Sequence, residues 1–321
     1  MTMLTPLHSS DQSDNRLRTN TIVQLSLWLL TAVVLVLLFD HGLGWDRTLQ
    51  AWSTMSVGQL TICFILLSVS YLARAARLHS HFSSEISGHF CRCLRIVLHH
   101  NFFNNILPMK TGEVVFPLLI HRHFGIKISR AAGALFSFRI ADLVFLSLLS
   151  LLLAMLSMHL LELAGSAVLF FLIVMAAGCL LLLIIFKFRR SVTWIDKYWG
   201  QFKSGFPSNQ GMMWTIFIWT TLAWSTKLIA YALILSVFVK SLFSVSLLAA
   251  ASGELASSIP IHTPAAFGTF ESGILAVLIP VGFDTKTALT AALNLHLFIL
   301  ANTVLLAALG LLIGRHSDDS G

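Results

Sequence analysis

The chain has 321 residues, of which 56% are hydrophobic and only 11% are charged, and its formal net charge is +7. This composition excludes a soluble domain with one packed core, because its long uncharged apolar runs would remain in contact with water. Runs of about 20 apolar residues are what the hydrocarbon core of a bilayer requires of a helix. The sequence therefore predicts an all-α polytopic membrane protein.

Six apolar runs are long enough to span a bilayer. The first follows a polar tail over 1–20 and lacks the small-residue cleavage site of a signal peptide, so we expect it to be retained. Residues 314–321 form a second polar tail, which leaves 21–313 as a single integral-membrane domain. The expected spans cover about 21–39, 54–73, 131–156, 165–186, 212–239 and 286–313.

Basic residues predict the orientation of these spans, because loops rich in Lys and Arg remain cytoplasmic. Segment 74–130 holds eight basic residues, Arg74 and Arg77 among them, and 187–211 holds five, whereas the intervening connections hold almost none. Both termini are therefore expected in the cytoplasm. This asymmetry accounts for most of the net charge, so we infer no nucleic-acid partner, although a basic inner face favours anionic lipid headgroups.

Neither the cysteines nor the histidines of the sequence indicate a disulfide or a metal site. Cys63 and Cys179 fall inside expected helices, and Cys91 and Cys93 fall on the cytoplasmic side, where thiols stay reduced. We expect no disulfide. The thirteen histidines include no spacing typical of metal ligands, such as H-E-x-x-H, so we expect neither a metal nor a cofactor.

A Pro/Gly-rich break interrupts the last part of the apolar sequence. The segment "SVSLLAAASGELASSI" (244–259) ends before Pro260 and Pro264, Gly268 permits a turn, and "TFESGILAVLI" (269–279) resumes a helix. Neither half is long enough to span a bilayer alone. Non-helical backbone at membrane depth is tolerated only where protein or a watery cavity covers it. This pattern predicts a re-entrant helix hairpin beside a cavity.

A similar break lies within 93–122, where a moderately apolar helix ends in an Asn-rich stretch. Pro108 and Gly112 are four residues apart, as are Pro264 and Gly268, and a glutamate follows each pair. Interrupted segments at corresponding positions of two halves point to a transporter substrate site. The two hairpins are compatible with an inverted repeat, although such spacings also arise by chance in a chain with seven prolines and nineteen glycines.

Charged residues inside the expected helices are the main candidates for a site, because each costs about 2.5–3.5 kcal/mol at a helix centre. Arg139 lies about ten residues into its helix, roughly 15 Å deep, and Asp142 follows on the same face. N-termini of half-helices at the breaks would add backbone N–H groups for an anion. Ion pairs that only fix helix packing remain the alternative, above all for Lys227. The expected substrate-binding residues are Asn105, Lys110, Glu113, Arg139, Asp142, Lys227, Glu254 and Glu271, with structural breaks at Pro108, Gly112, Pro260, Pro264 and Gly268.

Three motifs in order, "NILPMKTGE" (105–113), "FRIADL" (138–143) and "IPIHTPAAFGTFE" (259–271), resemble a known family. It is the flippase-like membrane region of lysylphosphatidylglycerol synthetases and of stand-alone bacterial and archaeal proteins. Family members usually read L-P-G-R-x-G-E, R-x-x-D and P-x-x-P-G-G-x-G-x-x-E at these places. The matching residues are Pro108, Lys110 in place of Arg, Gly112, Glu113, Arg139, Asp142, Pro260, Pro264, Gly268 and Glu271.

Several departures mark a divergent stand-alone member. Met109 replaces a usual Gly, Ala265 and Ala266 replace the Gly pair, and Phe116 stands where many members have Arg. The chain ends eight residues after Ile313 with no aminoacyl-transferase domain, so we expect the lysine-transfer activity of the larger relatives to be absent.

The resemblance implies movement of a lipid between leaflets. We expect a translocator in the bacterial inner membrane that holds the headgroup of an anionic phospholipid or polyprenyl-linked lipid in a central polar cavity. No G-x-x-x-x-G-K-[ST] motif is present, so a gradient or simple facilitation would drive transport. The alternatives are a non-transporting membrane partner of a lipid or glycan assembly complex and an integral-membrane lipid-modifying enzyme. An enzyme is not expected, because such enzymes need a nucleophile or an acidic metal-binding cluster at the membrane surface, and the sequence shows neither a D-D-x-x-D pattern nor an Asp pair in any loop.

Overall fold

The computed structural model describes residues 50, 52–107, 112–156, 195–258 and 266–318. Two compact units divide the chain, Met1–Ser53 and Thr54–Gly321, and nearly all described residues belong to the second. Two of the expected spans, 21–39 and 165–186, lie outside the described residues. The described elements are all α-helices apart from short turns, as the composition predicts.

Four described helices are long and apolar enough to cross a membrane. They coincide with the four remaining expected spans, although some begin or end a few residues away from the predicted bounds. Their agreement with the apolar runs confirms a multi-pass membrane protein. These helices are α3 (Val57–His81), α7 (Ile128–Leu156), α10 (Gln210–Val239) and α13 (Thr285–Asp318), the last being apolar as far as Ile313.

Shorter helices flank the two expected breaks. A pair of helices, α5 and α6, lies before and after the first break, and α11 and α12 lie before and after the second. The break residues 108–111 and 259–265 are outside the described residues. The short helices are α4 (Ser83–Ile86), α5 (Phe90–Ile106), α6 (Val115–Phe124), α9 (Ile195–Lys203), α11 (Phe243–Ser257) and α12 (Thr269–Leu278).

Local side-chain chemistry explains where several helices begin and end. The hydroxyl of Ser56 accepts a hydrogen bond from the backbone N–H of Gln59 (3.2 Å), and the Gln59 side chain accepts one from the Ser56 N–H (2.9 Å). This reciprocal capping box starts α3. Asn209 caps α10 by accepting from Met212 N (2.8 Å). α6 ends at Gly125, whose φ of 68° is a left-handed conformation that suits glycine.

The C-terminal end of α3 corrects the sequence analysis. The prediction ended this span at residue 73 and assigned Arg74 and Arg77 to a cytoplasmic loop. Instead, the helix continues to His81. The segment after residue 73 is rich in Ala, Arg and Leu, which are strong helix formers, and contains neither Gly nor Pro. As a result Arg77 is only 6% exposed and lies inside the helix bundle.

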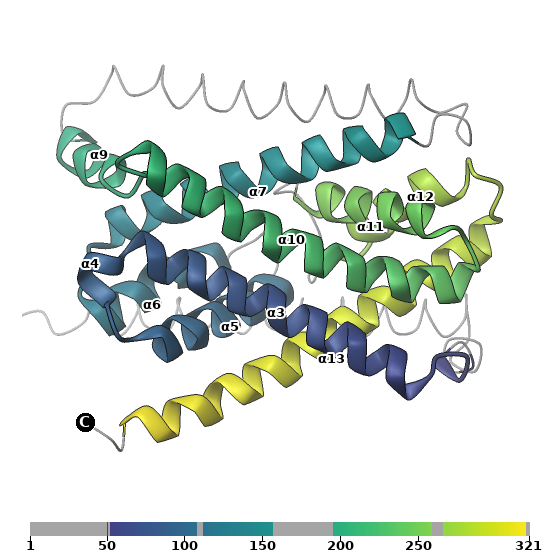
Figure 1. Cartoon of the computed structure of the whole chain (residues 1–321), viewed down its shortest axis with the longest axis horizontal. Coiled ribbons are helices and arrows are strands. Elements are labelled where there is room, and N and C mark those ends of the chain that lie inside the picture. Colours follow the sequence, from purple (N-terminus) through teal and green to yellow (C-terminus); the bar gives the residue numbers. More distant parts are fainter. Residues whose placement is uncertain (1–49, 51, 108–111, 157–194, 259–265, 319–321) are drawn as a thin grey trace, which may run out of the picture. The chain divides into compact units, whose positions relative to one another are not determined.

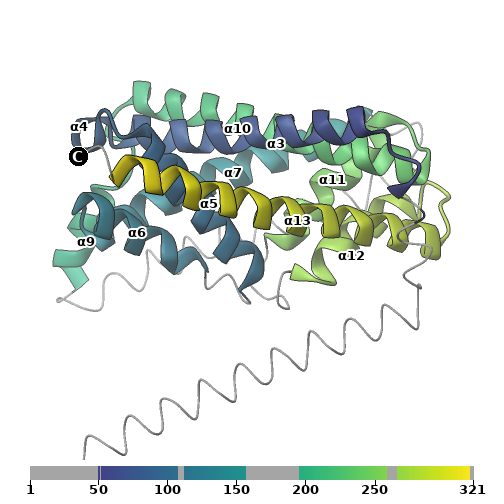
Figure 2. The ribbon, with the colours of Figure 1, turned by 90° about the horizontal axis from the view of Figure 1, so that it is seen from below.

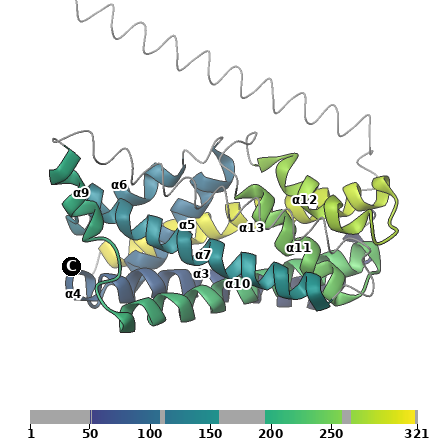
Figure 3. The ribbon, with the colours of Figure 1, turned by 90° about the horizontal axis from the view of Figure 1, so that it is seen from above.

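The helices after residue 54 form two halves with the same order of elements. Each half contains a long helix, a broken helix pair and a second long helix. α3 and α10 pack against each other, as Figures 1 and 2 show. The broken pair of each half packs against the last long helix of the other half, since α5 contacts α13 and α11 contacts α7. α11 also packs on α12 (Figures 1 and 3).

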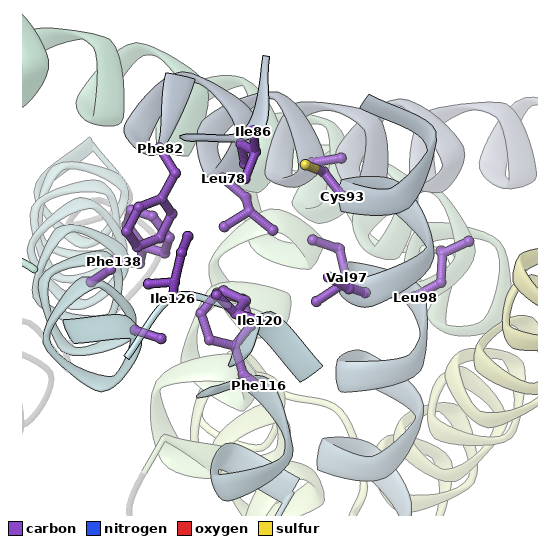
Figure 4. Packing of buried hydrophobic residues seen from close by; sticks show 14 of the residues in the cluster. Leu78, Phe82, Ile86, Cys93, Val97, Leu98, Phe116, Ile120, Ile126 and Phe138 are labelled. Carbon is purple, nitrogen blue, oxygen red and sulfur yellow. The ribbon is translucent and has the colours of Figure 1, made fainter. Parts of the chain in front are cut away.

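A buried hydrophobic cluster holds the first half together (Figure 4). Leu78 on α3, Ile96 on α5, Ile120 on α6 and Phe138 on α7 each have no more than 3% of their surface exposed. Contacts from four helices therefore fix the position of α6 relative to α7. This packing brings the residues that follow the first break close to Arg139, one residue beyond Phe138.

Candidate functional site: a charged cavity inside the bundle

A cavity of about 780 Å³ lies between helices of both halves. Ligand pockets typically have volumes of about 300–1,000 Å³, so the space is large enough for a lipid headgroup. Residues from α3, α5, α7, α10, α11 and α13 line it, together with residues next to both breaks. Its described charged residues are the bases Arg74, Arg77, Arg139 and Lys227 and the carboxylates Glu113, Asp142 and Glu254.

Asp142 is the most heavily contacted of these carboxylates. Its Oδ1 accepts hydrogen bonds from Arg77 Nη1 (2.6 Å) and Trp224 Nε1 (2.9 Å). Its Oδ2 lies 3.4 Å from Arg139 Nη1, so the expected contact between Arg139 and Asp142 is present. Arg77 also donates to Thr220 Oγ1 (2.7 Å). A carboxylate that is 4% exposed is compensated here by two guanidinium groups and an indole N–H from three helices.

Arg139 also joins α7 to the first break. Its Nη2 forms an ion pair with Oε1 of Glu113, which lies just before α6. About a third of the Arg139 side chain remains exposed, and the residue lines the cavity. Arg139 thus connects Glu113 and Asp142 and presents a partly accessible cation to the cavity.

Lys227 and Glu254 form a further ion pair of the cavity. The Lys227 Nζ lies 2.7 Å from Glu254 Oε1, which joins α10 to α11. The same ammonium lies 4.7 Å from the centroid of the Trp224 ring and 5.2 Å from that of Tyr231, within the range of cation–π contacts. Both members of the pair line the cavity.

The glutamate of the second break is placed differently from the prediction. Glu271 was expected among the substrate-binding carboxylates, but it is buried and does not line the cavity. Its Oε1 lies 2.6 Å from His296 Nδ1, and its Oε2 accepts a hydrogen bond from the N–H of Gly268 (2.7 Å). The N-terminus of α12, expected to offer N–H groups to an anion, therefore already holds a carboxylate of its own helix. Phe267 stacks on His296 with ring centroids 4.3 Å apart.

The two halves share this arrangement of glutamate and base. Glu113 pairs with Arg139, 26 residues later, and Glu271 pairs with His296, 25 residues later. In each half the glutamate after the break thus contacts the following long helix. His296 was not among the expected site residues, although its spacing from Glu271 is nearly the same as that of Arg139 from Glu113.

Of the remaining expected residues, Asn105, Gly112 and Gly268 lie in the described part of the chain. Asn105 lines the cavity and donates from Nδ2 to Thr303 Oγ1 (2.9 Å). Gly112 lies so close to α5 that a Cβ there would come within 2.4 Å of the backbone nitrogen of Asn104, and Gly268 has a left-handed φ of 87°. Both glycines are therefore required by the backbone. Lys110, Pro108, Pro260 and Pro264 lie outside the described residues.

Three residues that line the cavity were not among the expected site residues: Arg74, Arg77 and Trp224. Arg74 and Arg77 were assigned to a loop, although the unbroken helical composition after residue 73 could have indicated a longer helix. Trp224 was not selected, and no local pattern distinguishes it from an interfacial tryptophan. Within the described ranges, no group of three His, Cys, Asp or Glu side chains could hold a metal ion.

The family model for the lysylphosphatidylglycerol synthase TM region matches residues 23–307. The chain belongs to this family. The match spans the motifs at both breaks and the Arg139–Asp142 pair. Membership of the lysylphosphatidylglycerol synthase TM region family points to a function related to membrane lipids. Searches of curated proteins and of solved structures found no match.

Proposed function

We propose that this protein is a translocator that moves an anionic phospholipid or a polyprenyl-linked lipid between the leaflets of the bacterial inner membrane. The observation that carries the proposal is the 780 Å³ cavity, which seven charged described residues line inside a bundle of membrane-spanning helices. Charged side chains at membrane depth are costly, and they commonly mark substrate or ion pathways. Here they would hold the headgroup.

The described cavity lining includes both charged and apolar residues, as a lipid has both a charged headgroup and apolar chains. The cavity lining also includes apolar residues that reach the surface, since Val114 is 63% and Ile128 is 44% exposed. A headgroup could occupy the charged part while the acyl or isoprenoid chains remain in the bilayer. The apolar lining includes Val114, Ile128, Leu135, Phe136 and Phe202.

Transport would use the two similar halves. We infer that the two broken pairs are re-entrant hairpins of an inverted repeat, and that the halves rock about the contact between α3 and α10. The pairs Glu113–Arg139 and Glu271–His296 would keep each hairpin attached to the long helix that follows it. In this arrangement both termini are cytoplasmic, the direct partners are membrane lipids, and the protein carries its lipid without chemical change.

Reconstitution into liposomes tests this function. Purified protein would be incorporated with acyl-labelled phosphatidylglycerol, phosphatidylcholine or a polyprenyl phosphate, and exposure of the label to an external quencher would report translocation. We expect rapid translocation of an anionic lipid by the wild type and its loss in Arg139→Gln. Arg130→Gln is the matched control, because Arg130 pairs with Glu85 outside the cavity. No translocation of any of these lipids by the folded wild type would contradict the proposal.

A further inference from the structure

Three of the four bases in the cavity have a carboxylate partner, and Arg74 does not. Arg77 pairs with Asp142, Arg139 with Glu113 and Lys227 with Glu254. Within the part of the chain that the structure describes, no carboxylate lies within ion-pair distance of Arg74. Among the described bases of the cavity, Arg74 is therefore the one that makes no direct ion pair with a carboxylate.

The Trp224 ring positions the Arg74 side chain. The guanidinium carbon of Arg74 lies 4.8 Å from the ring centroid, and the indole N–H donates to Asp142 (2.9 Å). Trp224 is only 5% exposed, so its ring is held in place. Arg74 itself is partly exposed and lines the cavity. A guanidinium stacked on one face retains its in-plane N–H donors, which match the oxygens of a phosphate.

The charges of the described lining leave one positive charge in excess. Four bases stand against three carboxylates, with the histidines taken as neutral. A single negative charge on a bound headgroup would balance this excess. A phosphodiester carries one charge, whereas a phosphomonoester carries about 1.5 to 2 at neutral pH. The second charge of a phosphomonoester would lack a partner at a depth where an unpaired charge is costly.

We propose that Arg74 binds the phosphodiester group of the transported lipid and that the cavity is selective for lipids with one negative charge. This inference rests on the proposed function and specifies its substrate class. A glycerophospholipid and a polyprenyl phosphodiester share this chemistry. Arg74 would form the charge-assisted contact with the phosphate, and the ion pairs among the other charged residues of the cavity would remain intact.

Competition between lipids in one sample tests the assignment. Native mass spectrometry of the detergent-solubilised protein would compare phosphatidylglycerol, phosphatidylcholine, phosphatidate and diacylglycerol with identical acyl chains, and a polyprenyl phosphodiester in a second series. We expect the wild type to prefer a phosphodiester monoanion over both phosphatidylcholine and phosphatidate. Arg74→Gln should reduce the preference for phosphatidylglycerol over diacylglycerol, which lacks the phosphate, by roughly ten- to a hundredfold, as expected for loss of a hydrogen bond to a charged group.

Two further variants separate the effect of charge from that of folding. Arg74→Lys should keep the order of preference with weaker binding, because an ammonium lacks the planar donor pair. Arg122→Gln removes the same charge from an exposed position of α6 outside the cavity and should leave the preference unchanged. Because each preference is a ratio measured on the bound, folded protein, partial unfolding of a variant does not alter it.

The possible results distinguish this inference from the proposed function. A wild-type preference for phosphatidylglycerol over diacylglycerol that Arg74→Gln leaves unchanged overturns the assignment of Arg74 alone. Stronger binding of phosphatidate than of phosphatidylglycerol overturns the charge match. A wild type that prefers no anionic lipid in either series contradicts the proposed function as well. If the preference is as expected, the series with tighter binding identifies the glycerophospholipid or the polyprenyl lipid as the source of the phosphodiester.

Discussion

Glu271 and His296 form a buried contact, with 2.6 Å between Oε1 and Nδ1, that fastens the second break to the last long helix. Both side chains are no more than 5% exposed. Because the other carboxylate oxygen accepts from Gly268 N, one side chain fixes both the turn before α12 and its position against α13. The corresponding pair of the first half, Glu113–Arg139, is more exposed and faces the cavity. The two breaks are thus held alike, but both members of the first pair line the cavity, whereas of the second pair His296 lines it and Glu271 does not.

Glu271→Ala should therefore lower the free energy of unfolding more than Glu271→Gln does. Alanine leaves Gly268 N and His296 without their acceptor, a loss of about 1–3 kcal/mol. Glutamine keeps an acceptor for Gly268 N and retains most of the packing. Thermal unfolding in detergent would measure the difference. Equal melting temperatures for the two variants would show that the carboxylate does not hold the break.

Asp142→Asn should be among the most destabilising single changes in the described bundle. It leaves Arg77, which is 6% exposed, as an uncompensated charge, and breaking a buried pair typically costs about 3–5 kcal/mol. The double variant Arg77→Gln with Asp142→Asn should lose less stability than the sum of the two single variants. Denaturant titration of all four proteins measures this coupling. Strict additivity would argue against a structural pair.

Lys227 and Glu254 should behave as a unit in folding. Lys227→Gln leaves Glu254 without its cation, and Glu254→Gln leaves Lys227 without its anion, so each single variant should be less stable than Lys227→Gln with Glu254→Gln. Transport by a well-folded double variant then tests whether the pair serves packing alone. Activity close to wild type would assign it a structural role, and loss of transport despite normal stability would assign it a role in the cavity.

Close contact between α11 and α12 should make Gly273 intolerant of a side chain. A Cβ at this position would lie 2.4 Å from the backbone oxygen of Ser252 and 2.8 Å from the Cα of Gly253. Since backbone atoms cannot move aside without separating the helices, Gly273→Ala should cost about 1–3 kcal/mol. Gly200→Ala in α9 is the control, because a Cβ added there would meet nothing within 4 Å and the change should be neutral or stabilising by up to about 1 kcal/mol. Thermal unfolding of both variants provides the measurement, and equal effects would contradict the close contact.

Asp284 should make the start of α13 sensitive to acid. Its Oδ1 accepts from the backbone N–H groups of Lys286 (3.1 Å) and Thr287 (3.0 Å). Hydrogen bonds from the side chain and backbone of Thr287 lower the pKa of this carboxyl below its ordinary value. A lowered folded-state pKa adds stability above the unfolded-state pKa, and this stability is lost as the pH falls through the folded-state value.

The melting temperature of Asp284→Ala, measured from pH 7 down to pH 3, tests this effect. The variant should melt below the wild type at neutral pH, and the difference should shrink as the wild-type carboxyl takes up its proton. Asp284→Asn keeps a capping side chain without the charge, so its melting temperature should depend less on pH than that of the wild type. A constant difference between wild type and Asp284→Ala over this range would contradict the prediction.

Local features of the sequence were sufficient to predict the positions of the four long described helices, apart from the end of α3. The expected span 131–156 became α7, and 212–239 became α10, because the length of an apolar run depends only on neighbouring residues. α11 ends at Ser257 and α12 begins at Thr269, on either side of the expected second break, whose residues 259–265 lie outside the described residues. The end of α3 was placed too early, since a cluster of basic residues was interpreted as a loop signal although its composition favours a helix.

The sequence by itself determined that this is a helical membrane protein with two broken segments and a few charges inside its helices. Only the tertiary structure decided which charged side chains form ion pairs with one another. Arg77 and Asp142 are 65 residues apart, and Trp224 reaches the same carboxylate from a third helix. Helical periodicity places each side chain on a face of its own helix, but the neighbour of that face depends on how helices from both halves pack. That packing left Arg74 at the cavity without a carboxylate partner among the described residues and buried Glu271 against His296.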